Sequence, residues 1–224
     1  MQQEKFHGPY IMNRSEELNF ASADFKIYIM DRFKQEKCAE LIANLQSMID
    51  SSPSHPIYTT TDTIKSPYEL PKTNPVALDV YISSTGGDFD VLNQLSFLFA
   101  MAKNKGIIVR TSVPAYAGSC ASMLAIQGTP GFRIMGENAQ HFVHFGRTVN
   151  EVNLETEIDK AYQDMHNHAN STKKLYLRYT NISESELKEL RSDQYGYVSA
   201  KKCLHLGFCD WILQNNGVLK SNCK

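Results

Sequence analysis

Two patterns of apolar residues alternate along most of the chain. Short segments rich in β-branched and aromatic residues are typical of strands. They cover residues 25–30, 76–82, 107–113, 133–135, 140–145 and 209–213. Segments with apolar side chains three or four residues apart are typical of helices. They cover 35–49, 91–103, 119–126, 154–179, a segment that follows Ser183 and one that starts at 198. Because strands alternate with helices, the pattern predicts parallel pairing and an α/β fold.

The same pattern predicts one main domain, residues 25–213, with no internal repeat. Residues 1–24 are polar, and we expect a flexible N-terminal segment. Residues 51–75 are rich in Ser, Thr and Pro and are predicted to form a loop inserted in the domain. Residues 214–224 are expected to be a C-terminal tail. A capping box is also predicted before the helix that follows Ser183, because Glu186 stands three residues later.

Charge and composition exclude several classes of function. With 23 Lys and Arg against 24 Asp and Glu, the chain has no basic field for nucleic acid or an anionic membrane. The apolar run 97–102 is far shorter than the roughly 18 residues of a membrane span, and residues 1–18 contain no apolar signal region. The number of cysteines, 5, is odd, which indicates reduced thiols, and the absence of a CxxC pair argues against a zinc site bound by cysteines. The histidine spacings do not favour a metal either, so we expect a cytoplasmic protein without metal.

Three elements could carry chemistry. Ser119 lies among small residues after a predicted strand and at the start of a helix, where a substrate can approach closely. Gly86 and Gly87 follow another strand and could offer an unhindered N–H to an oxyanion. His144 ends a third strand and could act as a base. Each feature alone also fits a structural role: tight packing, a turn with positive φ, or a core histidine.

Taken in order, the motifs resemble the proteolytic subunit of the Clp protease, the ClpP-like serine peptidases. The resemblance covers about residues 25–213. Val80–Gly87 is similar to the family's strand ending in Asn-Ser-Pro-Gly-Gly, and the segment leading to Ser119 resembles its Gly-x-Ala-x-Ser element. Residues 131–144 and 197–210 are similar to two further family motifs. The resemblance implies the ClpP/crotonase-like ββα spiral, with residues 154–179 as its protruding handle helix.

Two serines compete for the position of the nucleophile. Aligning Ser119 with the family serine continues without a gap to His144, 25 residues later. Choosing Ser122, which precedes a Met as in the family, requires a deletion of three residues. The position of the acid is also open. An ungapped count places Arg191 where classical members have Asp, whereas Asp193 resembles the shorter spacing of phage-type relatives. We expect Ser119 and Asp193.

The resemblance implies a serine endopeptidase that uses no cofactor. Ser119 would be the nucleophile, His144 the base and Asp193 the group that orients it, with backbone N–H groups of Gly87 and Cys120 holding the oxyanion. The family hydrolyses peptides and unfolded proteins inside heptameric rings, often paired into tetradecamers, and works with an AAA+ Clp ATPase. The N-terminal segment 1–24 would then be an axial loop.

Departures from the family pattern leave alternatives open. Thr85 replaces the family's Pro before the two glycines, and Asp79 occupies a position that is aromatic in many members and belongs to the ATPase-docking site. A catalytically silent structural subunit of the same fold is one alternative. A crotonase-type acyl-CoA enzyme, which shares the fold and the two oxyanion donors, is another.

Overall fold

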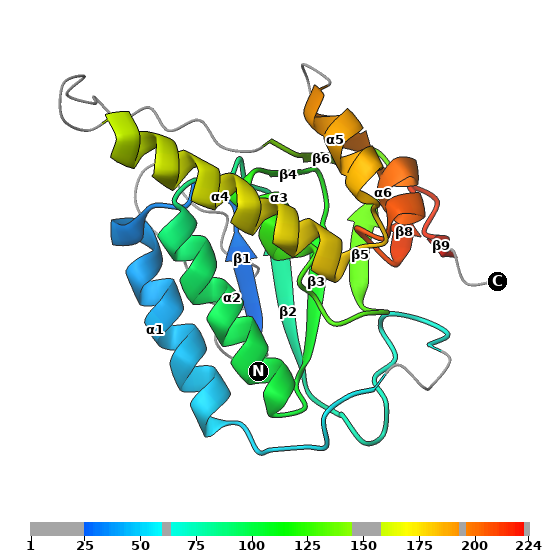
Figure 1. Cartoon of the computed structure of the whole chain (residues 1–224). Coiled ribbons are helices and arrows are strands. Elements are labelled where there is room, and N and C mark those ends of the chain that lie inside the picture. The colour runs from blue at the N-terminus through cyan, green and yellow to red at the C-terminus, as the bar shows by residue number, and fades with distance from the viewer. Residues whose placement is uncertain (1–24, 60–63, 145–157, 193–195, 222–224) are drawn as a thin grey trace, which may run out of the picture.

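A mostly parallel sheet of six strands forms the centre of the protein, seen here in a computed structural model that describes residues 25–59, 64–144, 158–192 and 196–221 (Figure 1). Its strand order is β1-β2-β3-β5-β8-β9. The bounds are β1 Lys26–Ile29, β2 Ala77–Ile82, β3 Ile108–Val113, β5 Arg133–Gly136, β8 Trp211–Leu213 and β9 Leu219–Ser221. All neighbours pair in parallel except β8 and β9. The predicted α/β fold with parallel pairing is therefore confirmed.

A second, smaller sheet stands beside the carboxyl ends of the first. It contains β4 (Tyr116–Gly118), β6 (Gln140–Phe142) and β7 (Tyr197–Ser199). The strands β4 and β6 run parallel, whereas β6 and β7 run antiparallel. A parallel bridge between Ser84 and Ala117 joins this sheet to the segment that follows β2. The two sheets thus meet where the Gly-Gly turn and Ser119 lie.

Six helices cover the sheets in the described part of the chain. They are α1 Gln35–Ser51, α2 Phe89–Asn104, α3 Cys120–Ala125, α4 Ile158–Tyr179, α5 Glu184–Ser192 and α6 Ala200–Leu206. Helices α1 and α2 lie side by side over one face of the main sheet, and the long α4 crosses above α3 (Figure 1). The ring of Phe89 at the start of α2 stacks on His168 of α4, with 4.9 Å between centroids.

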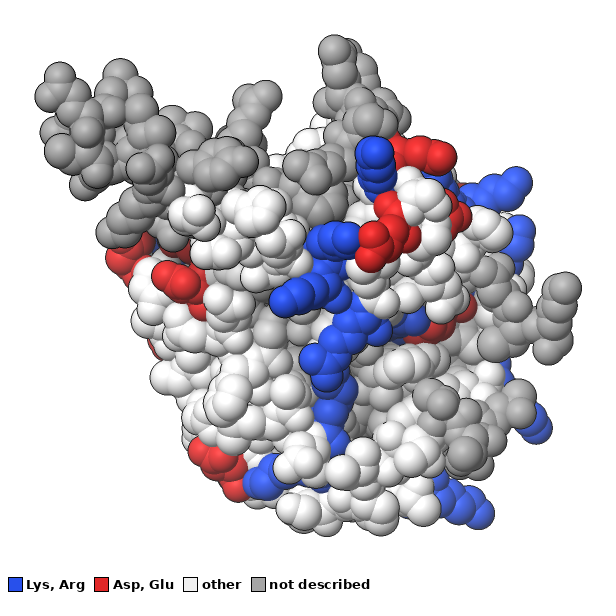
Figure 2. Space-filling view, in the orientation of Figure 1, with Lys and Arg blue, Asp and Glu red and all other residues white. Residues whose placement is uncertain are grey.

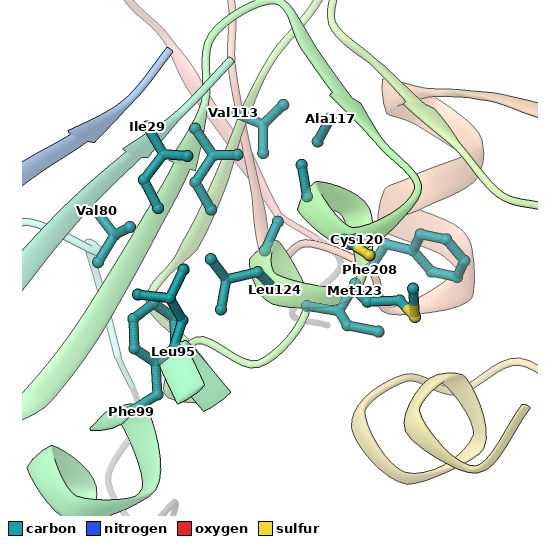
Figure 3. Packing of buried hydrophobic residues seen from close by; sticks show 14 of the residues in the cluster. Ile29, Val80, Leu95, Phe99, Val113, Ala117, Cys120, Met123, Leu124 and Phe208 are labelled. Carbon is teal, nitrogen blue, oxygen red and sulfur yellow. The ribbon is translucent and has the colours of Figure 1, made fainter. Parts of the chain in front are cut away.

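The short helix α3 lies inside the core. Every one of its residues is buried. Leu124 points toward the main sheet and α2, whereas Cys120 and Met123 lie next to Phe208 (Figure 3). Burial on all sides explains why this segment has no polar face. The helix that begins just after Ser119 is therefore held by packing around its whole circumference.

The structure departs from the predicted elements at three short strands. The segment 197–199 is β7, and α6 begins only at Ala200, so the prediction that a helix starts at 198 was wrong. The strand β4 was not predicted, and β9 lies in the segment expected to be a tail. Strands of three residues show too little alternation to be recognised from a pattern. The insertion 51–75 holds no helix or strand beyond Ser51 in its described part, 52–59 and 64–75.

The predicted capping box is present at the start of α5. The backbone N–H of Ser183 donates to Glu186 Oε2 at 2.8 Å, and the N–H of Glu186 donates to Ser183 Oγ at 3.2 Å. The Ser183 hydroxyl also donates to Glu186 Oε2 at 2.6 Å, and this bond, followed by the one from the Ser183 N–H, lowers the pKa of Glu186. The reciprocal pair satisfies two N–H groups that a helix start leaves without intrahelical acceptors.

A buried ion pair joins three layers of the fold. Arg133 of β5 binds Asp210, with Nη2 and Oδ1 2.6 Å apart and side-chain exposures of only 9% and 20%. The same guanidinium donates to the carbonyl of Tyr179 at the end of α4 (2.7 Å) and, more weakly, to that of Ile126 after α3 (3.4 Å). One side chain therefore ties α3, α4 and the start of β8 to the sheet.

Breaking this ion pair should cost far more than breaking an exposed one. We expect Arg133→Leu to lower the free energy of unfolding by about 3 kcal/mol, because carbonyl and carboxylate acceptors lose buried partners. The matched control is Lys173→Met, which removes the exposed Lys173–Glu184 pair (2.7 Å; 42% and 68% exposed). That change should cost less than about 1 kcal/mol. Urea unfolding of both variants measures the difference, and equal losses would contradict the role given to Arg133.

Lysine and arginine side chains form a column down one face, from α4 past the C-terminal end of α2 (Figure 2). Lys103 of α2 and Arg178 of α4 both approach the ring of Tyr179, at 5.3 Å and 5.4 Å from its centroid. The Lys103 ammonium also donates to the carbonyl of Gln127 at 3.0 Å. Burial, and then the charges of Arg178 and Arg133, lowers the pKa of Lys103 to about 8.

The stability of the protein should therefore depend on pH through Lys103. Below pH 8 the amine is charged in both states, and the folded state bears the full penalty of holding it. Above pH 8 the folded protein releases this proton before the unfolded chain does, so the penalty falls as the pH rises toward 10.5. Lys103→Met should be more stable than the wild type at pH 7 by about 1–2 kcal/mol. This margin should shrink between pH 8 and 10 in urea unfolding, and a margin independent of pH would contradict the argument.

Candidate functional site

The Gly-Gly turn after β2 packs backbone against backbone. Ser84 pairs with the segment before Ser119: its N–H donates to the carbonyl of Tyr116 at 3.1 Å, and its carbonyl accepts from Gly118 at 2.9 Å. The Ser84 hydroxyl accepts from the N–H of Gly86 at 3.1 Å. Gly86 has φ +87°, and a Cβ there would lie 2.5 Å from the Gly118 oxygen and 2.7 Å from the Cys120 nitrogen. Only glycine fits this place in both conformation and space.

Ser119 stands at the junction of β4 and α3 with an unusual backbone. Its φ of 53° and ψ of −124° lie outside the regions that residues other than glycine normally occupy. The N–H of Ser119 donates to the carbonyl of Phe142 at 2.9 Å, and its carbonyl accepts from Met123 at 3.1 Å. The side chain is half-buried. Such a strained residue, held by neighbours on both sides, is a common feature of functional sites.

Gly87 and Cys120 lie beside Ser119. The Cys120 thiol donates to the carbonyl of Gly87 at 3.0 Å, which brings the two backbones together. The bridge between Gly87 and Phe33 uses the carbonyl of Gly86 and the N–H of Asp88, and so leaves the N–H of Gly87 outside this pairing. The N–H of Cys120, the first of α3, has no intrahelical acceptor. Burial raises the pKa of the Cys120 thiol, which is therefore a poor nucleophile.

His144 follows β6 as Ser119 follows β4. The two strands are parallel neighbours with Gly118 opposite Phe142, so both residues emerge at the same end of this sheet. His144 is half-buried, and its ring centroid lies 5.2 Å from that of Phe142. The pairing of β4 with β6 thus brings Ser119 and His144 to one edge.

Asp193 lies outside the described residues. The described chain on either side of it ends at Ser192 of α5 and resumes at Gly196. Gly196 has φ +50°, and its carbonyl accepts from the N–H of Val143, the residue before His144, at 2.9 Å. The side chain of Arg191, the other candidate position, is also outside the described part.

Ser122, the alternative nucleophile, lies deeper than Ser119. It is completely buried, and its hydroxyl is 2.8 Å from His141 Nδ1 and 2.8 Å from the hydroxyl of Tyr176. Burial lowers the pKa of His141 to about 3, so this imidazole is neutral. The sequence analysis did not predict this cluster. Tyr176 occupies an apolar position of a helix, where a buried hydroxyl gives no separate signal, and His141 lies inside a predicted strand.

The described residues hold no group of three or more His, Cys, Asp or Glu that could bind a metal ion. Within the same part of the chain, no helix is both long and apolar enough to cross a membrane. The cysteines described there, at 38, 120, 203 and 209, are all buried free thiols.

The model of the Clp protease family matches residues 70–216, which include the Gly-Gly turn, Ser119 and His144. The chain belongs to the Clp protease family. Among solved structures, a ClpP1 mutant from Listeria monocytogenes is similar to it with a TM-score of 0.64 and 13% identity, over 85% of this chain and 91% of that one. No curated protein matches. The ClpP-like fold predicted from the motifs is confirmed, and this member belongs to a family of serine peptidases.

The close packing of the Gly-Gly turn in this Clp family member predicts a severe effect of one methyl group. Gly86→Ala places a Cβ against backbone atoms of Gly118 and Cys120, so we expect a loss of several kcal/mol in unfolding free energy or failure to fold. Gly217→Ala is a matched control, because Gly217 has a similar φ of +83° but nothing within 4 Å. The control should cost only about 1 kcal/mol. Thermal unfolding compares the two, and equal destabilisation would show that φ alone, not close packing, requires the glycine.

Proposed function

We propose that the protein is a serine endopeptidase subunit whose triad is Ser119, His144 and Asp193. One observation carries the proposal: Ser119 is held at positive φ between β4 and α3, against the Gly86–Gly87 turn and beside the strand that leads to His144. We infer that a serine hydroxyl, a base and two backbone donors meet at this edge of the sheet. Acyl transfer through a serine requires this combination of groups.

In the proposed reaction, Ser119 Oγ attacks a peptide carbonyl and His144 takes the hydroxyl proton. The oxyanion that forms accepts hydrogen bonds from the N–H groups of Gly87 and Cys120, each worth about 3 kcal/mol in comparable sites. His144 then gives the proton to the leaving amine, and an ester of Ser119 is left. Water, deprotonated by His144, hydrolyses this ester and restores the free serine.

Accessibility supports Ser119 over Ser122. The hydroxyl of Ser122 is fully buried and already engaged by two partners, whereas Ser119 is half-buried at the start of the helix. A substrate could reach Ser122 only if α3 were displaced from the core. The positive φ of Ser119 also favours it, because strain of this kind persists only where the surroundings impose it.

The position of Asp193 in the chain supports its role. It stands three residues before Gly196, which binds the residue preceding His144. Three extended residues span at most about 10 Å, a length of chain that would let the carboxylate reach the imidazole. Asp193 would hold His144 in the correct tautomer and stabilise the imidazolium.

We extend the proposal to the family's assembly: heptameric rings, possibly paired, that enclose the sites and receive unfolded chains from an AAA+ Clp ATPase. The long helix α4 supports this as a handle, because it crosses the core with only Thr172 and Tyr176 buried among its residues 166–179. The charge of Asp79 in the region of ATPase docking is compensated by Arg110, at 2.6 Å. Arg110 also donates to the carbonyl of Pro67, so the insertion covers this pair.

A fluorophosphonate probe tests the nucleophile directly. We expect an adduct on Ser119, located by peptide mass, that is absent in Ser119→Ala and still formed on Ser119 in Ser122→Ala. Asp193→Asn should label at least 100-fold more slowly, because His144 loses the partner that orients it.

Other results would redirect the assignment. An adduct on Ser122 would contradict the choice of nucleophile. Unchanged labelling in Asp193→Asn would remove Asp193 from the triad. Folded protein without any adduct would favour a catalytically silent subunit, and retention on immobilised coenzyme A would then favour the crotonase alternative.

A further inference from the structure

We propose that Ser122, His141 and Tyr176 form a positioning network. It fixes Ser119 and His144 relative to each other and makes their alignment depend on the position of α4 against the core. The inference rests on the proposed function, since it concerns the same two catalytic residues. None of the three network residues would touch the substrate.

The network joins three elements through hydroxyl and imidazole groups that are shut off from solvent. Ser122 belongs to α3, His141 to β6 and Tyr176 to α4, and their exposures are 0%, 1% and 1%. Both hydrogen bonds of the Ser122 hydroxyl are 2.8 Å long. Phe208 encloses the group, since its ring stacks on Tyr176 (5.3 Å) and meets His141 edge-on (5.6 Å).

The protons of the network have one arrangement that uses every hydroxyl. The Tyr176 hydroxyl donates to Ser122 Oγ, and the Ser122 hydroxyl donates to His141 Nδ1, which accepts because the imidazole is neutral. In the reverse direction the hydroxyl proton of Tyr176 would have no acceptor within the network. Buried hydroxyl groups left without partners are costly, so the first arrangement prevails.

Both catalytic residues are only a few bonds from this network. Ser122 lies one helical turn after Ser119, and the two turns are joined by the hydrogen bond from Met123 N–H to the Ser119 carbonyl. His141 lies three residues before His144 on the strand that pairs with β4. The hydrogen bond between Ser122 and His141 therefore couples the helix that follows the nucleophile to the strand that leads to the base.

Such a coupling is needed because α3 has only six residues. A helix this short has few internal hydrogen bonds and little stability of its own, so its position depends on its neighbours. An error of about 1 Å between reacting groups can cost a hundredfold in rate. Hydrogen bonds from a hydroxyl are about 2.5–3.0 Å long, and at about 3.6 Å the bond is lost. A displacement of α4 would thus break the Tyr176 bond first and release α3.

Loss of the network should slow the chemistry without weakening binding of the probe. For fluorophosphonate inactivation, we expect Tyr176→Phe to lower kinact about tenfold with KI changed less than twofold. Tyr179→Phe removes the same atom one turn later on α4 and should leave both constants unchanged.

His141→Leu should also lower kinact, and His141→Asn, whose amide can take the place of Nδ1, should restore most of it. The pH dependence of kinact should shift in Tyr176→Phe and not in Tyr179→Phe.

Hydrogen exchange gives a readout that does not need activity. In Tyr176→Phe, amides of α3 and β6 should exchange at least tenfold faster than in Tyr179→Phe, while amides of β1 and β2 stay unchanged. Equal exchange in the two variants, or equal kinact, would overturn the positioning role. If the wild type gives no adduct at all, the proposed function fails, and the exchange of α3 and β6 alone decides whether α4 is coupled to them.

Discussion

The close approach of the turn after β2 to the start of α3 is the constraint on which the site depends. Gly86 leaves no room for a side chain between its own backbone and that of Gly118 and Cys120. This contact joins the main sheet to the small sheet and packs directly against Ser119, which has a positive φ. The backbones of Gly87 and Cys120 come close together at the same place, where the Cys120 thiol donates to the Gly87 carbonyl at 3.0 Å. The strain at Ser119 is thus sustained by the packing of the segments around it, not by the residue itself.

Two sets of buried polar groups hold the segments that make this contact. The Arg133–Asp210 pair ties α3, α4 and β8 to the sheet, and the Ser122 cluster ties α3 to β6 and α4. Both sets end on α3, the short helix next to Ser119. Buried polar groups stabilise the fold most when every group in the network has a hydrogen-bond partner. Such a network also specifies one arrangement of the core. A helix of six residues is placed accurately by these bonds, where apolar packing alone would tolerate small shifts.

The same helix α4 connects the site to the outside of the molecule. Its Tyr176 reaches the core and its Tyr179 carbonyl binds Arg133, whereas several of its other described side chains are exposed. In the proposed assembly, a change in the position of α4 against the core would therefore affect Ser119 through only a few intermediate residues. The similarity to a Listeria ClpP1 at 13% identity shows that this fold tolerates wide changes of sequence.

Much of the main sheet and its helices could be predicted from the sequence, because strands such as β2 and β3 are long enough to show apolar runs and α1 shows its period of 3.6. The capping box at Ser183 was predicted because its two residues are local in sequence. The motif order also pointed to the family and to Ser119 and His144 as candidates.

The sequence did not reveal the short strands β4, β7 and β9, the strained backbone of Ser119 or the cluster around Ser122. Those depend on residues far apart in the chain: Gly86 meets Cys120, and Ser122 meets His141 and Tyr176. Periodicity records which side of its own element a residue faces. Which element it meets there is decided only when the tertiary packing brings the segments together.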